Sequence, residues 1–246
     1  LEDALSHAIV EGAVEASFQP VFDLQSRRLC AVKVVPRWSH NAYGAIAPAE
    51  VMEVADSINQ GAALLLSLLR STFNLLGRLT TQAELRIYAE ASENLFSQPG
   101  FAQSLFELLE RHRVGPGHLQ IELTGKRSAT YGEAFLASIR SLRDAGVIFA
   151  TSDVSRAIDG RNRLANLDFG TLKLERTLVE EATRSERSRG IIKGLGAMAV
   201  KMGAEVVAEG VDRREDVERL QRLGIALGQG DALAPVMTPD DLLRYL

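Results

Sequence analysis

The chain has 246 residues, with 28 basic and 32 acidic side chains, a formal net charge of −4 and 46% hydrophobic residues. These proportions are typical of a soluble globular protein, and the length suits one or two domains or a single α/β barrel. The mildly acidic balance argues against a large basic surface for a nucleic acid polymer. No apolar run approaches the roughly 20 residues of a membrane span, so we expect no membrane contact by this chain.

Cysteine usage and the first residue suggest the setting of the chain. The only cysteine, Cys30, cannot form an internal disulfide, and the N-terminus has no signal peptide pattern. A reducing, cytoplasmic location is therefore expected. The chain begins at Leu1 rather than at methionine. We expect residues 1–246 to form a single domain of a longer multidomain protein.

Strands and helices alternate along the chain. Apolar residues at helical spacing, Leu5, Ala8, Ile9 and Ala13, predict a first helix. Two strands at 17–23 and 29–38 follow, joined by a polar turn at 25–28. Further helices are predicted at 48–79, 101–113, 132–145, 161–166, 188–202 and 213–223, and further strands at 85–89, 119–123, 147–151, 171–174, 205–208 and 225–227. Such alternation predicts parallel strands with helical crossovers, and about eight strands in one unbroken series favour a closed (β/α)8 barrel.

Charged and amide side chains lie on or just after the apolar strands of this predicted barrel. In a barrel of this kind the C-terminal ends of the strands converge on one mouth, where active sites lie. Carboxylates there would hold Mg²⁺, and cations would meet the oxygens of a phosphorylated ligand. The alternative is that these residues are polar strand caps in solvated loops. The residues concerned are Lys33, Arg37, Glu90, Glu122, Asp153, Lys173, Glu209 and Gln229.

Ordered motifs from Phe18 to Pro235 resemble those of the EAL domain family, the cyclic di-GMP phosphodiesterases. Phe18-Gln19-Pro20-Val21 is similar to the Q-P-I segment that opens the family pattern. Arg37-Trp38 with His40, Gly44, Ile46 and Pro48 follows its R-W-x-H-P-x-x-G-x-I-x-P pattern, with Asn41 at the first proline. The later matches are Glu122-Leu123-Thr124 (E-I/L-T-E), Asp153 (D-D-F-G-T-G), Lys173 (K-I-D), Ala208-Glu209-Gly210-Val211 (A-E-G-V) and Gln229-Gly230 (Q-G).

The resemblance implies a barrel whose first strand is antiparallel to the others. It also implies a mechanism in which two Mg²⁺ or Mn²⁺ ions activate a water that attacks a phosphodiester of cyclic di-GMP. The catalytic positions retained from the family are Glu122, Asp153, Lys173 and Glu209. The ligand-binding positions implied are Gln19, Val35, Arg37, Asp153, Glu209, Gln229 and Pro235.

Several positions depart from the family pattern. The glutamate that names the family is Lys33, so that E-A-L becomes Lys33-Val34-Val35, and the metal-binding asparagine is Glu90. The first aspartate of D-D-F-G-T-G is Ser152, and the second glutamate of E-L-T-E is Gly125. The loop 154–157 has lost both glycines, and the stretch from 229 to 235 is one residue short.

The change at Lys33 has the largest chemical effect. An ammonium in place of a carboxylate repels a divalent cation, and the loss of an aspartate at Ser152 removes an oxygen ligand. We therefore expect no functional catalytic residue, no bound metal and no cofactor, and Mg²⁺ or Mn²⁺ only if the chain is an enzyme after all. Lys33 is expected to replace the metal, with its ammonium within about 4 Å of Glu90 or Glu122.

Three hypotheses remain open. The chain is an inactive EAL domain that acts in bacterial signalling as a cyclic di-GMP receptor, or a nucleotide-free module that binds a protein partner, or a weakly active phosphodiesterase. Gln19, Arg37 and Gln229 support the receptor. The changed loops support the interaction module, and the retained carboxylates support the enzyme. The resemblance also allows a homodimer, because EAL domains commonly pair.

Overall fold

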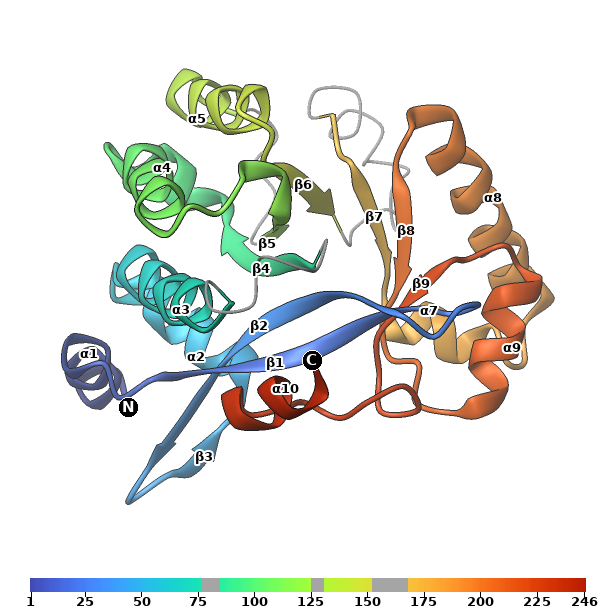
Figure 1. Cartoon of the computed structure of the whole chain (residues 1–246), viewed down its shortest axis with the longest axis horizontal. Coiled ribbons are helices and arrows are strands. Elements are labelled where there is room, and N and C mark those ends of the chain that lie inside the picture. Colours follow the sequence, from blue (N-terminus) through green and yellow to red (C-terminus); the bar gives the residue numbers. More distant parts are fainter. Residues whose placement is uncertain (77–84, 125–130, 152–167) are drawn as a thin grey trace.

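Eight strands form a closed barrel in the computed structural model, which describes residues 1–76, 85–124, 131–151 and 168–246 (Figure 1). The order around the barrel is β1-β9-β8-β7-β6-β5-β4-β2, and β2 pairs again with β1. β1 is antiparallel to both neighbours and the remaining barrel pairs are parallel, which confirms the predicted fold class and the antiparallel first strand. The strands are β1 (Glu15–Asp23), β2 (Leu29–His40), β4 (Arg86–Ser92), β5 (Leu119–Thr124), β6 (Ile148–Thr151), β7 (Thr171–Leu174), β8 (Glu205–Ala208) and β9 (Leu227–Gly228).

The two neighbours of β1 hold it very differently. β1 and β2 form a long hairpin in register from Glu15 opposite Arg37 to Phe22 opposite Leu29, with a bulge at Val21 and Phe22. The turn between them is stabilised by Asp23, whose carboxylate accepts hydrogen bonds from the backbone N–H of Gln25 and Ser26. The junction of β1 with β9 has only two residue pairs, Phe22 with Gly228 and Asp23 with Leu227. The barrel is therefore closed on one side by a long hairpin and on the other by a short contact.

Most helices lie around the outside of the barrel, and α1 packs beside α2 (Figure 1). In α3, for example, Leu64, Leu65, Leu68, Leu69 and Phe73 are buried at helical spacing. The helices are α1 (Glu2–Glu11), α2 (Pro48–Ser57), α3 (Gly61–Leu76), α4 (Phe101–His112), α5 (Glu133–Asp144), α7 (Arg176–Glu181), α8 (Glu186–Met202), α9 (Arg214–Arg222) and α10 (Pro239–Tyr245), with 3-10 turns η1 (Glu93–Ser97) and η2 (Pro116–His118).

The structure corrects some predicted boundaries. The single helix predicted over 48–79 is wrong: α2 ends at Ser57, Asn59 adopts a left-handed backbone with φ 57°, and α3 begins at Gly61. The last strand lies at β9 rather than at 225–227. The sequence analysis missed the short strand β3 (Gly44–Ile46), which pairs with β2, and the helices α7 and α10. The helix predicted over 161–166 lies outside the described residues.

The barrel interior is layered from one end to the other. Alternate residues of a strand point inward, so residues two apart occupy successive layers. An ion pair between Arg86 and Glu205 lies at the N-terminal ends of β4 and β8. The next layer is a small apolar cluster of Val21, Ala31, Tyr88, Val207 and Leu227. Charged and amide side chains form the layer above it, at the C-terminal ends of the parallel strands, and this layer is the candidate site.

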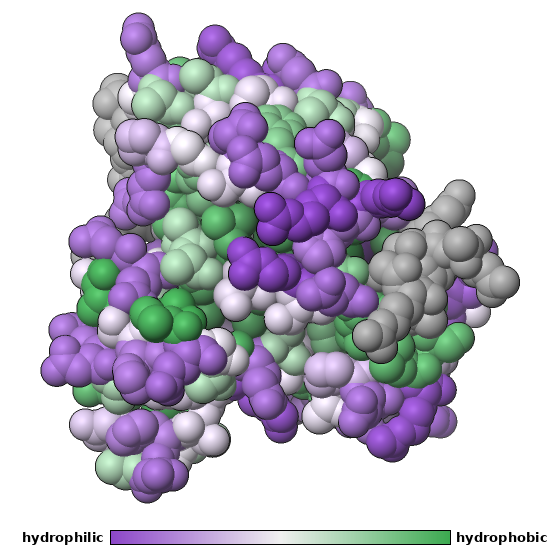
Figure 2. All heavy atoms as spheres, turned by 60° about the vertical axis from the view of Figure 1, so that its left-hand side comes forward, coloured by the Kyte–Doolittle hydropathy of each residue, from purple (hydrophilic) through white to green (hydrophobic). Residues whose placement is uncertain are grey.

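Polar side chains dominate the surface in the view of Figure 2, with hydrophobic side chains in separate areas between them. In the described part of the chain, no helix is both long enough and apolar enough to span a membrane.

Candidate functional site

Five charged side chains meet inside the mouth of the barrel, and we call them the mouth cluster: Lys33, Glu90, Glu122, Lys173 and Glu209. Glu90 on β4 lies in register with Glu122 on β5, so the two carboxylates project side by side. Lys173 lies on β7, and Glu209 directly follows β8. Strand alternation thus brings these residues together from β2, from the adjacent strands β4 and β5, and from the adjacent strands β7 and β8, as the sequence analysis predicted.

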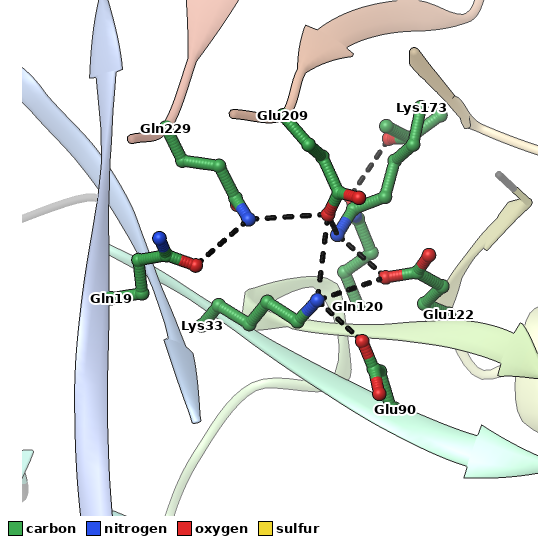
Figure 3. Close-up of polar contacts among 9 residues, drawn as sticks. Gln19, Lys33, Glu90, Gln120, Glu122, Lys173, Glu209 and Gln229 are labelled. Carbon is green, nitrogen blue, oxygen red and sulfur yellow. Dashed lines mark hydrogen bonds and ion pairs between the residues drawn. The ribbon is translucent and has the colours of Figure 1, made fainter. Parts of the chain in front are cut away.

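The ammonium of Lys33 lies among three carboxylates (Figure 3). Lys33 Nζ forms an ion pair with Glu90, and it lies 3.6 Å from Glu122 Oε2 and 3.4 Å from Glu209 Oε1. These contacts confirm the predicted position of Lys33 near Glu90 or Glu122. The contact with Glu209 was not predicted, and it shows that the lysine side chain reaches across the barrel from β2 toward β8.

Lys173 contacts two of these three carboxylates, those of Glu122 and Glu209, from the other side. Its Nζ donates hydrogen bonds to Glu122 Oε2 at 2.6 Å and to Glu209 Oε1 at 2.9 Å, and its side chain is fully buried. It also lies 5.8 Å from the ring centroid of Tyr88 in the apolar layer below. Two ammonium groups therefore bridge three carboxylates, which leaves the mouth cluster with one excess negative charge when all five groups are ionised.

Amide side chains extend the network toward β1. Gln229, directly after β9, donates one hydrogen bond to Glu209 Oε1 and one to Gln19 Oε1, each 3.1 Å long (Figure 3). Gln229 is buried, and Gln19 on β1 is half-buried. These two predicted ligand-binding positions are thus in the same network as the retained carboxylates.

The charges of the mouth cluster stabilise one another. Burial opposes the charged form of Lys33, but the carboxylates of Glu122, Glu209 and Glu90 outweigh it and raise the pKa of Lys33 well above its ordinary value. Burial likewise opposes ionisation of Glu209, yet Lys173 and Lys33 lower the pKa of Glu209 from 4.5 to about 2. Both lysines therefore face an ionised carboxylate at neutral pH.

The described carboxylates of the mouth cluster are not arranged around a divalent metal ion. Mg²⁺ and Mn²⁺ need several oxygen ligands turned toward one point, with no cation at that point. Here the oxygens of Glu90, Glu122 and Glu209 face the ammonium of Lys33 instead. Accordingly, the described residues include no group of three or more His, Cys, Asp or Glu side chains suited to hold a metal.

The remaining predicted positions are spread over the rim. Arg37, at the far end of β2, is exposed and forms an ion pair with Glu15 on β1. Val35 lies between Lys33 and Arg37 on β2, and it lines a cavity of about 300 Å³ that also contacts Lys33 and Glu90. Pro235 is exposed, outside the mouth cluster. Asp153, Ser152 and Gly125 lie outside the described residues.

Three polar residues that shape the site were not among the predicted site residues. Thr171 donates a 2.7 Å hydrogen bond to Gln120 beneath the cluster, and both are fully buried. The inward position of Gln120 follows from its spacing to Glu122, whereas nothing in the sequence points to Thr171. Glu15 opposes Arg37 in the β1–β2 hairpin, a pairing set by the bulge at Val21 and Phe22 that the sequence alone does not reveal.

Comparisons with known proteins agree with the geometry. Residues 2–236 match the model of the EAL domain. The chain is 27% identical over 237 residues to cyclic di-GMP phosphodiesterase RocR of Pseudomonas aeruginosa, covering 95% of this chain and 60% of RocR. It spans between 27% and 60% of the length of the first curated relatives it matches.

Solved structures share the fold over nearly the whole chain. The EAL enzyme Bd1971 in its cAMP-bound form superposes with a TM-score of 0.87 at 21% identity, covering all of this chain and 69% of Bd1971. The EAL domain of Xanthomonas citri FimX, in complex with c-diGMP, gives 0.83 at 19% identity, with 95% and 92% covered. The barrel with its antiparallel first strand, the charged mouth and the match over 2–236 together establish that the chain belongs to the EAL domain family.

Proposed function

We propose that this EAL domain is catalytically inactive and acts in signalling as a receptor for cyclic di-GMP that needs no metal ion. The observation that carries the proposal is the ammonium of Lys33 among Glu90, Glu122 and Glu209. A fixed cation there repels Mg²⁺ or Mn²⁺ and occupies the carboxylate oxygens that would ligate it. Without a metal to lower its pKa, water is a poor nucleophile for a phosphodiester at neutral pH.

Recognition of the dinucleotide needs positive charge and hydrogen-bonding groups rather than a metal. Arg37 is the exposed cation at the rim and supplies charge-assisted hydrogen bonds to a phosphate. Gln19 and Gln229 present amides beside the mouth cluster. RocR is a cyclic di-GMP phosphodiesterase, and the FimX EAL domain is solved in complex with c-diGMP, so the same ligand is the natural candidate.

Binding of labelled cyclic di-GMP, measured with Mg²⁺ and again with EDTA, tests the proposal. We expect equal affinity in both conditions and no hydrolysis. The Arg37→Ala variant should bind more weakly by about 1.5 to 3 kcal/mol, the usual contribution of a hydrogen bond to a charged group. Lys201→Ala, which removes an exposed lysine of α8, is the control and should bind like the unmodified protein.

One observation favours a second candidate, a nucleotide-free module that binds a protein partner. Arg37, the main cation offered to a phosphate, already has an anionic partner in Glu15. If the unmodified protein binds no cyclic di-GMP at tens of micromolar, the receptor proposal is wrong and this second candidate replaces it. Hydrolysis that depends on Glu209 would instead support an enzyme.

A further inference from the structure

Glu15 and Arg37 form an ion pair across the first hairpin of the barrel. They are directly opposed in the register of β1 and β2, and the side chains retain 58% and 57% of their exposure. Opposed residues of an antiparallel pair project from the same face of the sheet. The carboxylate of Glu15 is thus held beside the guanidinium by strand pairing rather than by a chance rotamer.

The same face of the hairpin leads from this ion pair to the mouth cluster. Every second opposed pair along the hairpin lies on this face. From the ion pair toward the mouth cluster, these pairs are Glu15 with Arg37, Ser17 with Val35, and Gln19 with Lys33. Two steps of two residues along a strand span about 13 Å. Arg37 therefore lies at the outer end of a continuous track whose inner end is Lys33 and Gln19.

We propose that Glu15 is an internal competitor for the phosphate of the ligand at Arg37. The inference rests on the proposed function, because it assumes that cyclic di-GMP binds along this track. A carboxylate and a phosphodiester are both anions that seek the same guanidinium donors, and placed together they repel each other. Binding must therefore displace Glu15, and the ion pair in the free protein lowers the affinity for the ligand.

The surroundings of Glu15 allow this displacement. Glu15 and Arg37 line a groove of about 600 Å³ bounded by the loop after α1, the outer face of α3 and the start of α10. Polar side chains of that groove, among them Ser67 and Asn74 on α3, offer hydrogen-bonding groups to a carboxylate that leaves Arg37. The freed carboxylate thus remains solvated, so displacement costs only the surface ion pair itself.

Affinities for cyclic di-GMP of four proteins test the inference: the unmodified chain, Glu15→Gln, Arg37→Ala, and the double variant. Glu15→Gln should bind about two- to five-fold more tightly, the range expected when a surface ion pair no longer has to be broken. The double variant should bind like Arg37→Ala, because without the guanidinium there is nothing to compete for. Glu218→Gln is the matched control, since Glu218 forms an exposed ion pair with Arg222 on α9, on another side of the barrel (Figure 1).

Salt gives a second readout that a purely structural role of Glu15 would not change. In Glu15→Gln the charge of Arg37 is uncompensated, so its affinity should fall more steeply with ionic strength than that of the unmodified chain. Equal affinity and equal salt dependence in the two proteins would overturn the inference while the receptor stands. The inference would also be overturned if Glu15→Gln increased the affinity for cyclic di-GMP as much in the Arg37→Ala background as in the unmodified chain. The same holds if Glu218→Gln increased the affinity as much as Glu15→Gln does. Failure of the unmodified chain to bind cyclic di-GMP at tens of micromolar would overturn the receptor proposal itself.

Discussion

Lys33 on β2 and Glu90 on β4 form an ion pair, and each of them stands where the EAL pattern has a different residue. The family has glutamate and asparagine at these positions, whereas this chain has lysine and glutamate. The positive charge gained at one position is thus met by a negative charge gained at the other. The mouth of this barrel thus pairs its own charged side chains, and the proposed exclusion of a metal rests on this pairing.

The first prediction concerns hydrolysis. The purified protein with Mg²⁺ or Mn²⁺ should not convert cyclic di-GMP to its linear product in a chromatographic assay, because the ammonium of Lys33 repels a divalent cation. Lys33→Glu alone should not restore activity, since the family pattern also requires acidic residues at Ser152 and Gly125. Turnover that disappears in Glu209→Ala would contradict the prediction, whereas turnover that persists there would indicate a contaminating enzyme.

The second prediction concerns the charge of Lys33. Lys33→Ala leaves Glu90, Glu122 and Glu209 facing one another with Lys173 as their remaining cation, and should lower the free energy of unfolding by about 3 kcal/mol or more. Mn²⁺ should raise the melting temperature of this variant but not that of the unmodified protein, because the ion can take the vacated position.

An exposed lysine supplies the control for this comparison. Lys201→Ala on α8 should change neither the melting temperature nor the response to Mn²⁺. A melting temperature of the unmodified protein that rises with Mn²⁺ as much as that of Lys33→Ala would refute the exclusion of the metal by Lys33.

The third prediction follows from the pKa of Glu209, about 2 in the folded protein against an ordinary 4.5. A lowered folded pKa means that the unfolded chain binds more protons in acid. The stability that Glu209 contributes is therefore present above about pH 5 and is lost as the pH falls from there toward 2. Urea unfolding at a series of pH values should show this loss, and Glu209→Gln should flatten the dependence. An unchanged slope in the variant would show that other carboxylates cause the acid sensitivity.

The fourth prediction compares two glycines. Gly230, after Gln229, has φ 153°, and a side chain there would collide with the backbone of Val211. Gly230→Ala should therefore destabilise the protein by about 3 kcal/mol or more and displace Gln229. Gly190, inside α8, has open space around it, so Gly190→Ala should stabilise by about 0.5 to 1 kcal/mol. If Gly230→Ala and Gly190→Ala changed the free energy of unfolding in urea by the same amount, the close contact assigned to position 230 would be contradicted.

Periodicity was enough to predict the barrel, because most strands and most helices have a clear apolar repeat. Its failures have local causes. The apolar repeat runs from α2 into α3, and only the left-handed backbone at Asn59 breaks it, which a helical repeat does not reveal. The last strand lies at β9 rather than at the predicted 225–227. Its position is set by its hydrogen bonds to β8 and β1 and not by its own composition.

Contacts in the site could be predicted where the two residues lie on neighbouring strands. They could not be predicted where a side chain reaches across the barrel. Glu90 as a partner of Lys33 follows from the adjacency of β2 and β4. The contact with Glu209 depends on the length of the lysine side chain and on barrel curvature, which no strand pairing gives. The bulge at Val21 and Phe22 shifts the hairpin register by one residue, and the sequence gives no sign of a bulge. The pairing of Glu15 with Arg37 was therefore missed.

The short junction of β1 with β9 has a consequence for how the barrel opens. The backbones of the two edges are held together there by two residue pairs and by a hydrogen bond from the N–H of Leu24 to the carbonyl of Ala226. Local opening requires less free energy where few backbone bonds must break, so amide hydrogens at this junction should exchange with solvent earlier than those of the β1–β2 hairpin. Gln19 and Gln229 lie on opposite sides of this junction and are joined across it by one hydrogen bond. A ligand that contacts both glutamine side chains would hold the two strand edges together. Its binding would then slow the exchange of backbone amide hydrogens at the junction, even though the ligand contacts side chains there rather than the backbone.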